Sequence, residues 1–254
     1  MQKFLSILAI VFAISLPGGP APAGEPGWRI DQYTNAQGNM NVSMTARAIE
    51  IVLPKQKYRI YSAAPNWNVV YINEQIGNFI DFPHDKFMGS IMGRLGNQLG
   101  NDIQMLALPK PNIQKEGHLE YATYDRNLNV TDEQRRQLKI KGSATVLYAP
   151  RSIKAKYLRL ANIPKEPKEL VCKVSCVPMS FDYPISFNCL DGFKENLCVL
   201  STTLKRQEKS LTISPPSLKG LKRVNTEHEL FSHVHVNDVF ELFGDTTGEK
   251  NKTK

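Results

Sequence analysis

The stretch from Tyr58 to Asn73, YRIYSAAPNWNVVYIN, decides which fold this sequence can adopt. Aromatic and β-branched residues fill two short runs in it, and Ala64-Pro65-Asn66 separates them. Alternating side-chain character on both sides of a Pro-Asn break is typical of a β-hairpin. The second run is apolar at every position from Val69 to Ile72, so we expect both faces of the sheet to be covered there.

The alternation continues outward from this hairpin in both directions. It runs through residues 28–82, with a change of parity near Arg47 that indicates a bulge or a break between strands. We therefore expect an antiparallel meander of five or six strands in this part of the chain. More strands are predicted by short runs at 118–124, 140–148, 185–189 and 197–203. The sequence thus predicts a β-rich α+β fold, a curved, half-barrel-like antiparallel sheet with one or more helices packed on it.

After Phe82 the period of the apolar residues changes from two to four. The residues that recur at this spacing are Phe87, Ile91, Leu95 and Leu99. Such a stripe predicts a helix over residues 85–99, with Asp85 as its N-cap and Gly100 at its end. Glycines inside this segment lower its intrinsic helical stability by about 1 kcal/mol each relative to alanine. A packed core helix and a mobile lid are both compatible with this composition.

An apolar run near the N-terminus indicates export. Lys3 precedes FLSILAIVFAISL at residues 4–16, and Ala21-Pro22-Ala23 follows after a Pro-Gly-Gly break. This order is typical of a secretory signal peptide, and the run is shorter than the roughly 20 residues that a membrane-spanning helix needs. We expect residues 1–23 to be cleaved and the protein to be periplasmic or extracellular. An uncleaved membrane anchor is the alternative.

The rest of the chain is long enough for one β-rich domain over residues 24–244. A polar tail over residues 245–254 is expected to be disordered. A division into two parts is the alternative, in which the polar, linker-like Pro164–Pro167 segment separates a curved sheet with its helix (28–148) from a cysteine-bearing β subdomain (168–244).

The chain is basic, with a formal net charge of +8, and its basic residues are dispersed rather than gathered in one motif. A solvated surface that happens to be basic explains this pattern, and attraction to an anionic membrane surface is a second interpretation. No nucleic-acid-binding motif accompanies the charge, so we expect no nucleic-acid partner.

Four cysteines are clustered within one short region of the chain. Their spacing is C-x3-C-x12-C-x8-C, formed by Cys172, Cys176, Cys189 and Cys198. An even, clustered set in an exported protein predicts two disulfides, with three pairings open. A zinc site is the alternative, but this spacing is not one of its usual patterns.

Catalytic signals are sparse. The sequence contains no G-x-S-x-G, no H-E-x-x-H and no glycine-rich phosphate loop, and we expect no cofactor. The best metal-binding constellation is formed by His228, His233 and His235, completed by Glu227 or Glu229. Its spacing matches no standard site, which favours a partly exposed strand instead. A smaller cluster, Asp81, His84 and Asp85, lacks a nucleophile nearby in sequence.

The meander carries a resemblance to a known family. Trp28 with Gln32, the turn glycine Gly38, and the segments IEIVLPKQKYRIYSAAP (49–65) and WNVVYIN (67–73) make residues 28–82 resemble the opening of the exported lipoprotein-carrier and lipid-binding family. That family is built on an unclosed β half-barrel. The resemblance implies a curved antiparallel sheet with helices in its concavity and an apolar pocket for acyl chains. It also implies that residues 84–100 form a covering helix.

These observations give three functional hypotheses. The first is an exported, non-enzymatic protein that binds a lipid or acyl chain between the sheet and the predicted helix. The residues expected to line that pocket are Trp67, Val69, Tyr71, Phe87, Ile91 and Leu95. The second is a structural or protein-interaction module of the cell envelope or exterior with no ligand cavity. The third is a metal-dependent hydrolase that uses the C-terminal histidines.

Overall fold

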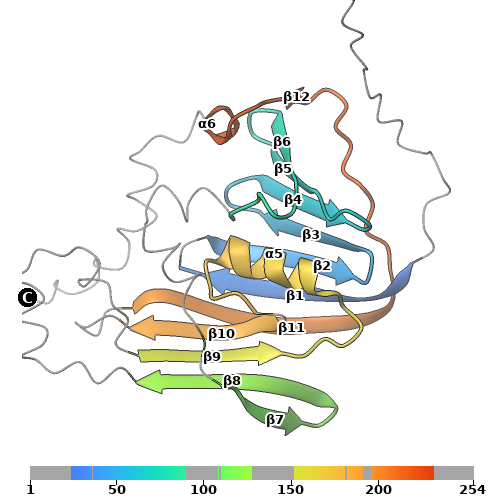
Figure 1. Ribbon diagram of the computed structural model, residues 1–254. Coiled ribbons are helices and arrows are strands. Elements are labelled where there is room, and N and C mark those ends of the chain that lie inside the picture. Colours follow the sequence, from blue (N-terminus) through green and yellow to red (C-terminus); the bar gives the residue numbers. More distant parts are fainter. Residues whose placement is uncertain are drawn as a thin grey trace, which may run out of the picture.

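One large sheet dominates the molecule (Figure 1). The computed structural model describes residues 24–35, 37–89, 108, 110–127, 152–180, 182–190 and 196–231. The first six strands are β1 (Glu25–Thr34), β2 (Gly38–Thr45), β3 (Ala48–Leu53), β4 (Tyr58–Ala63), β5 (Val69–Asn73) and β6 (Asn78–Phe82). The others are β7 (Asn112–Glu116), β8 (Leu119–Asn127), β9 (Ser152–Leu158), β10 (Tyr183–Leu190), β11 (Asn196–Leu211) and β12 (Lys222–Arg223).

The sheet consists of two meanders joined side by side. Its strand order is β12-β6-β5-β4-β3-β2-β1-β11-β10-β9-β8-β7. The central junction is the antiparallel pairing of β1 with β11, and β12 returns to pair in parallel with β6. The predicted meander over residues 28–82 is thus confirmed as β1 to β6, and the parity change near Arg47 is the tight turn between β2 and β3. The predicted β-rich fold with a helix on an unclosed antiparallel sheet is confirmed.

The Tyr58–Asn73 stretch forms the predicted hairpin. Strands β4 and β5 pair from Tyr58↔Asn73 to Ser62↔Val69. Trp67 lies in the connecting turn rather than in the strand, with a φ of 55°, and its carbonyl accepts a 2.7 Å hydrogen bond from the Ser62 hydroxyl. The hairpin therefore closes through a side chain as well as through its backbone ladder.

In the described residues, the helix that packs on the sheet is α5, Lys165–Ser175, a segment that the sequence did not predict to be helical. Pro164–Pro167 is not a linker, because Pro164 is the N-cap residue and the next three residues form the first turn. Proline is tolerated in a first helical turn, where its missing N–H has no intrahelical acceptor. Leu170, Val171 and Val174 then supply a buried stripe at helical spacing.

The predicted helix at 85–99 does not begin at Asp85. Residues 84–86 form a turn, residues 87–89 have no regular structure, and Gly89 has a φ of 100°, which an α-helix does not allow. The remainder of that prediction, with Ile91, Leu95 and Leu99, lies outside the described residues. The same holds for the predicted signal peptide, the strand at 140–148 and the C-terminal tail. In the part of the chain that the structure describes, no helix is long and apolar enough to cross a membrane.

Candidate functional site

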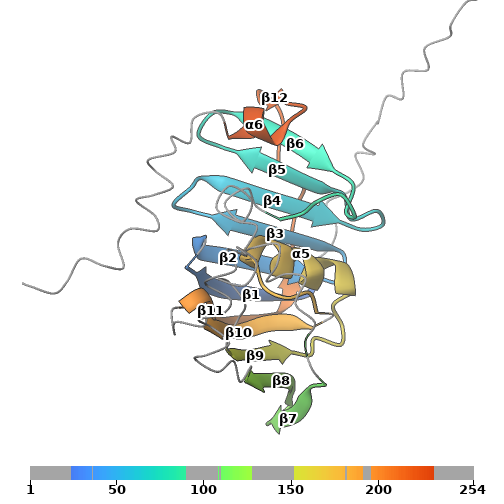
Figure 2. The same cartoon turned by 60° about the vertical axis from the view of Figure 1, so that its left-hand side comes forward.

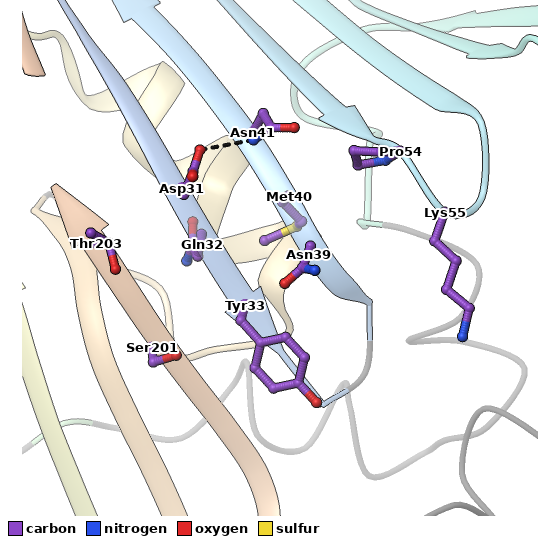
Figure 3. A pocket seen from close by; sticks show the side chains of 10 residues that line it. All are labelled: Asp31, Gln32, Tyr33, Asn39, Met40, Asn41, Pro54, Lys55, Ser201 and Thr203. Carbon is purple, nitrogen blue, oxygen red and sulfur yellow. Dashed lines mark hydrogen bonds between the residues drawn. The ribbon is translucent and has the colours of Figure 1, made fainter. Parts of the chain in front are cut away.

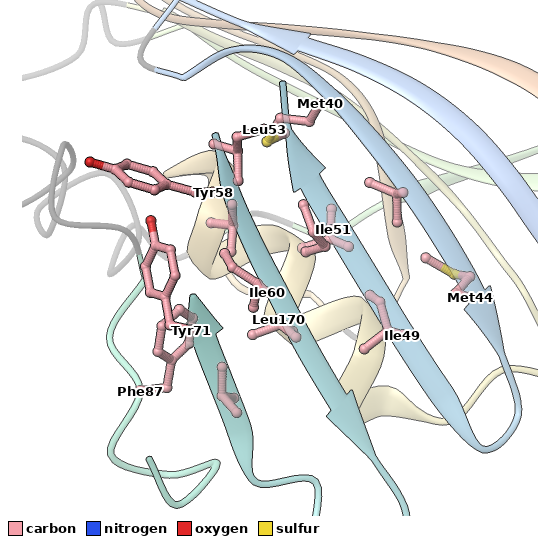
Figure 4. Packing of buried hydrophobic residues seen from close by; sticks show 14 of the residues in the cluster. Met40, Met44, Ile49, Ile51, Leu53, Tyr58, Ile60, Tyr71, Phe87 and Leu170 are labelled. Carbon is pink, nitrogen blue, oxygen red and sulfur yellow. The ribbon is translucent and has the colours of Figure 1, made fainter. Parts of the chain in front are cut away.

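The face of the sheet on which α5 packs, called the helix face below, carries the larger apolar core. Figure 4 shows Leu170 of α5 beside Ile49, Ile51 and Ile60 of strands β3 and β4. All four are at most 1% exposed. The same apolar cluster continues from Ile80 on β6 to Leu158 on β9. The helix face is therefore one continuous apolar surface across most of the sheet.

Helix α5 is much narrower than this surface. Its 11 residues give a length of about 16 Å. Twelve strands at about 4.8 Å spacing give a sheet roughly 50 Å wide. The helix lies across the middle of the sheet and contacts β3 and β10 (Figures 1 and 2). It cannot by itself shield the outer strands on the β4–β6 side from water.

An aromatic group covers part of that side. Its members are Tyr58, Tyr71, Phe82, Phe87 and Phe231, with ring centroids 5.2–6.2 Å apart in successive contacts. Most pairs meet edge to face, the geometry that aromatic quadrupoles favour. Burial raises the pKa of Tyr58 to about 12 and that of Tyr71 well above its ordinary value. The group is therefore a neutral, rigid apolar wall at neutral pH.

The structure brings together the predicted pocket residues that it describes. Trp67, Val69, Tyr71 and Phe87 all belong to the apolar cluster of the helix face. Phe87 reaches it from the segment that follows β6, without the predicted helix. Ile91 and Leu95 lie outside the described residues.

A buried chain of polar groups ties α5 to the sheet. The Tyr183 hydroxyl donates to Gln32 Oε1 at 2.9 Å, and Gln32 Nε2 donates to Ser175 Oγ at 3.2 Å. All three residues are at most 2% exposed. Sequence reasoning missed this series of hydrogen bonds. The only sequence signal for it was the glutamine at position 32, inside an otherwise half-apolar strand. The chain fixes the end of α5 at one position on the sheet.

A second polar tie lies at the edge of the helix. His84 Nε2 and Glu169 Oε2 are 3.3 Å apart, and Lys173 Nζ donates to the His84 carbonyl at 3.0 Å. Burial lowers the pKa of Lys173. These contacts attach the segment after β6 to α5, so they anchor the start of the aromatic group.

The predicted cluster of Asp81, His84 and Asp85 is not a catalytic constellation. Asp81 pairs with Arg223 of β12 at 2.7 Å, and Asp85 lies near Lys86 on the surface. His84 turns instead to α5 through Glu169. The three side chains therefore have separate structural partners.

The cysteines at the end of α5 do not form the disulfides that the cysteine spacing predicts. Cys172 and Cys176 are both thiols in this structure. Cys172 packs as a small apolar residue in a second core cluster with Tyr157, Phe187 and Leu200. Burial raises the pKa of Cys172 to about 12 and that of Cys176 to about 11. Backbone positions are described at Cys189 and Cys198, while their side chains lie outside the described part.

The predicted histidine site is not assembled in the described residues. His228 lies in the short helix α6 (Glu227–Leu230), whose N-terminus is a capping box between Thr226 and Glu229. Glu229 thus has a structural role. No group of three metal-ligating side chains occurs in the ranges that the structure describes, and His233 and His235 lie outside them.

The opposite face of the sheet, called the far face, carries a polar hollow of about 570 Å³. Gln32 points to α5, so Asp31 and Tyr33, its neighbours along the strand, point the other way. Figure 3 shows both beside Asn41, whose amide donates to Asp31 at 2.8 Å. The other polar side chains around the hollow are Asn39, Lys55, Ser201 and Thr203. Tyr33 is 46% exposed, which makes this hollow suited to a hydrogen-bonding partner with one flat apolar surface.

A second hollow of about 450 Å³ lies farther along the far face. Ala48 and Tyr61 of the sheet and Leu211 and Ile213 at the end of β11 form a small apolar cluster there. An Arg47–Glu25 pair, 3.7 Å apart, lies at its border. This hollow is apolar inside and charged at its border.

Comparisons with known proteins do not assign the chain to a family. No family model matches it, and no curated protein matches it. A solved structure described as an uncharacterized conserved protein from Thermus thermophilus is similar at 9% identity, over 79% of this chain and 90% of that chain, with a TM-score of 0.30. A likeness at that level carries no argument about this protein. The resemblance to the lipoprotein-carrier family therefore stays a prediction.

Proposed function

We propose that this chain is an exported, non-enzymatic protein that holds an apolar ligand, such as a lipid acyl chain, on the helix face of its sheet. The observation that carries the proposal is that α5 covers the middle of the apolar surface, whereas the aromatic side chains close its β4–β6 end. The surface continues from β6 to β9, whereas α5 is about 16 Å long and lies over the middle strands.

The ligand would lie beside α5, against the strands β4 to β6. Val69 and Tyr71 would form the floor there, and Phe87 and Phe231 the wall. These side chains are packed together and at most 6% exposed, so a ligand would enter by displacing part of the aromatic group. Aliphatic and aromatic walls with few polar groups are typical of pockets for acyl chains. Since neutral tyrosines and phenylalanines make the wall, the site would select uncharged, apolar parts of a molecule.

Purification without detergent, followed by solvent extraction and lipid mass spectrometry, tests the proposal. The folded protein is expected to release lipid in a fixed molar ratio and to bind a fluorescent fatty-acid probe. Phe87→Ala should lower the affinity for the probe about tenfold or more, equivalent to about 1.4 kcal/mol, because it removes the wall at the end of the site. Phe87→Leu, which conserves most of the buried volume, should weaken it less.

Tyr33→Ala is the matched control, because Tyr33 is an aromatic residue on the far face. Its affinity for the probe should equal that of the unaltered protein. Circular dichroism must show that each variant is folded. A folded, unaltered protein that carries no lipid and binds no probe would refute the proposal.

A second candidate function is a protein-interaction module of the cell envelope. It is favoured by the packing directly under α5, where Leu170, Val171 and Val174 fill the space against the sheet. The far-face hollow at Tyr33 would then be the contact surface, since exposed tyrosines are enriched in interfaces.

Co-sedimentation with cell-envelope material distinguishes this candidate from the first. The unaltered protein should sediment with the envelope, and the Tyr33→Ala variant should stay in solution. Met88→Ala serves as control, because Met88 is an exposed apolar side chain outside that hollow, at 48% exposure. Equal sedimentation of all three proteins would exclude the hollow as the contact surface.

A further inference from the structure

The hairpin of β10 and β11 places two of the four cysteines opposite each other. Phe187 pairs with Leu200, and two residues further along the antiparallel ladder Cys189 pairs with Cys198. The register shifts directly afterwards, where Leu190 pairs with Asn196. The two cysteines are therefore the last regular pair before the connection between the strands (Figure 1).

This register satisfies the distance that a disulfide needs. Directly opposed residues of an antiparallel pair have Cα atoms about 4.5 Å or about 5.5 Å apart, depending on whether the pair exchanges hydrogen bonds. Disulfides join residues with Cα atoms about 4.4–6.8 Å apart. Both kinds of pair lie inside this range of Cα distances, so the register brings Cys189 and Cys198 within disulfide reach.

The other two cysteines are in a different situation. Cys172 and Cys176 lie on the last turn of α5 and just after it, both buried, and both are thiols. Only the thiolate reacts in disulfide exchange. Both are buried, which keeps an oxidant from reaching them, and burial raises the pKa of both thiols, so their thiolate fraction at neutral pH is far below that of an ordinary thiol. They should therefore not compete with the hairpin pair for an oxidant.

We propose that Cys189 and Cys198 form a cross-strand disulfide in an oxidising compartment, while Cys172 and Cys176 remain thiols. This replaces the two disulfides expected from spacing with one bond of defined pairing. The proposal rests on strand register and is independent of the proposed ligand.

The oxidant is a disulfide compound, such as oxidised glutathione or a protein disulfide. One hairpin thiolate attacks a sulfur of that compound, forms a mixed disulfide and releases a thiolate. The second hairpin thiolate then attacks the protein sulfur of the mixed disulfide and releases the other thiolate. Two protein thiols lose their protons and two electrons in total, and the oxidant's S–S bond is reduced to two thiols.

Alkylation of the full chain tests the pairing. The protein is incubated with oxidised glutathione at neutral pH, unfolded in denaturant without reductant, alkylated with iodoacetamide and digested. Label is expected on Cys172 and Cys176 only, together with a linked peptide that contains Cys189 and Cys198. Prior reduction should give label on all four.

Two variants complete the test. In Cys189→Ser no linked peptide should form. Cys198 should instead carry a glutathione as an unresolved mixed disulfide, while Cys172 and Cys176 are labelled. In the double variant Cys172→Ser/Cys176→Ser the linked peptide should persist unchanged. Label on all four cysteines of the oxidised, unaltered protein, or a linked peptide that contains Cys172 or Cys176, would overturn the proposal.

Discussion

Raising the pH from about 9 to about 11 should lower the free energy of unfolding by about 4 kcal/mol through the two thiols at the end of α5. An ordinary thiol has a pKa of about 9, whereas burial raises the pKa of Cys172 to about 12 and that of Cys176 to about 11. Above about pH 9 the unfolded chain releases these protons and the folded chain keeps them. The stability that both thiols contribute below that pH is therefore lost as the pH rises, at about 1.4 kcal/mol per thiol and pH unit.

Other titrating groups change the total pH dependence of the free energy of unfolding, but they do not change the contribution of the two thiols. Burial also raises the pKa of Tyr71 and Tyr183, which adds to the loss above about pH 10. Burial lowers the pKa of Lys168 and Lys173, which favours the folded state as the pH rises towards their ordinary value and offsets part of the loss.

Urea unfolding at a series of pH values measures the effect. Comparison with the variant Cys172→Ala/Cys176→Ala isolates the thiols, because the tyrosines and lysines are the same in both proteins. As the pH rises, the free energy of unfolding of the variant should fall distinctly less steeply than that of the unaltered protein. Parallel pH profiles for the two proteins would contradict the prediction.

Replacing Gln32 by leucine should lower the free energy of unfolding by about 2–4 kcal/mol. Gln32 accepts from the Tyr183 hydroxyl at 2.9 Å and donates to Ser175 at 3.2 Å, and all three side chains are buried. Leucine leaves two buried polar groups without that partner, and each such group costs about 1–3 kcal/mol. The effect should appear as a lower urea midpoint with an unchanged m-value.

A double-mutant cycle distinguishes this polar chain from simple packing. Tyr183→Phe alone removes one hydrogen bond and should cost about 1–2 kcal/mol. Combined with Gln32→Leu it should cost less than the sum of the two, because the hydroxyl that leucine leaves without an acceptor is then absent. Gln114→Leu on the exposed strand β7 is the matched control and should stay within about 0.5 kcal/mol. If the stability losses of the two single variants add up to that of the double variant, the hydrogen bonds to Gln32 are not the cause of the loss.

The strands were predictable because their signals are local. In Tyr58–Asn73 the alternation, the β-branched residues and the turn residues all indicate the same hairpin, and the structure has it with the Tyr58↔Asn73 register. The same holds for β8 and β10, which lie close to the predicted runs. Partner choice was not predictable, because the β1–β11 pairing joins residues such as Arg29 and Glu208, 179 positions apart.

Two local signals explain where the described residues depart from the predicted helices. Residues 87–99 have a strong apolar stripe, but Gly89 adopts a positive φ and residues 84–89 form no helix. Pro164–Pro167 was interpreted as a break, although proline fits a first helical turn and Leu170, Val171 and Val174 follow at helical spacing. Of the predicted pocket residues, Val69 and Tyr71 lie on the helix face of β5, where strand alternation puts them on one side, whereas Trp67 reaches the same apolar cluster from the turn.

The β1–β11 junction also determines the order in which the molecule can assemble. Strand β1 is made first, yet it lies in the centre of the sheet, and its neighbour β11 ends at Leu211. The β2–β6 half can pair early through short turns, but the central ladder must wait until almost the whole domain has been synthesised. Folding rates fall as the sequence separation of contacts grows. Until that late step one edge of β1 stays unpaired. An unpaired strand edge can pair with another chain, so aggregation during biosynthesis should begin at this junction.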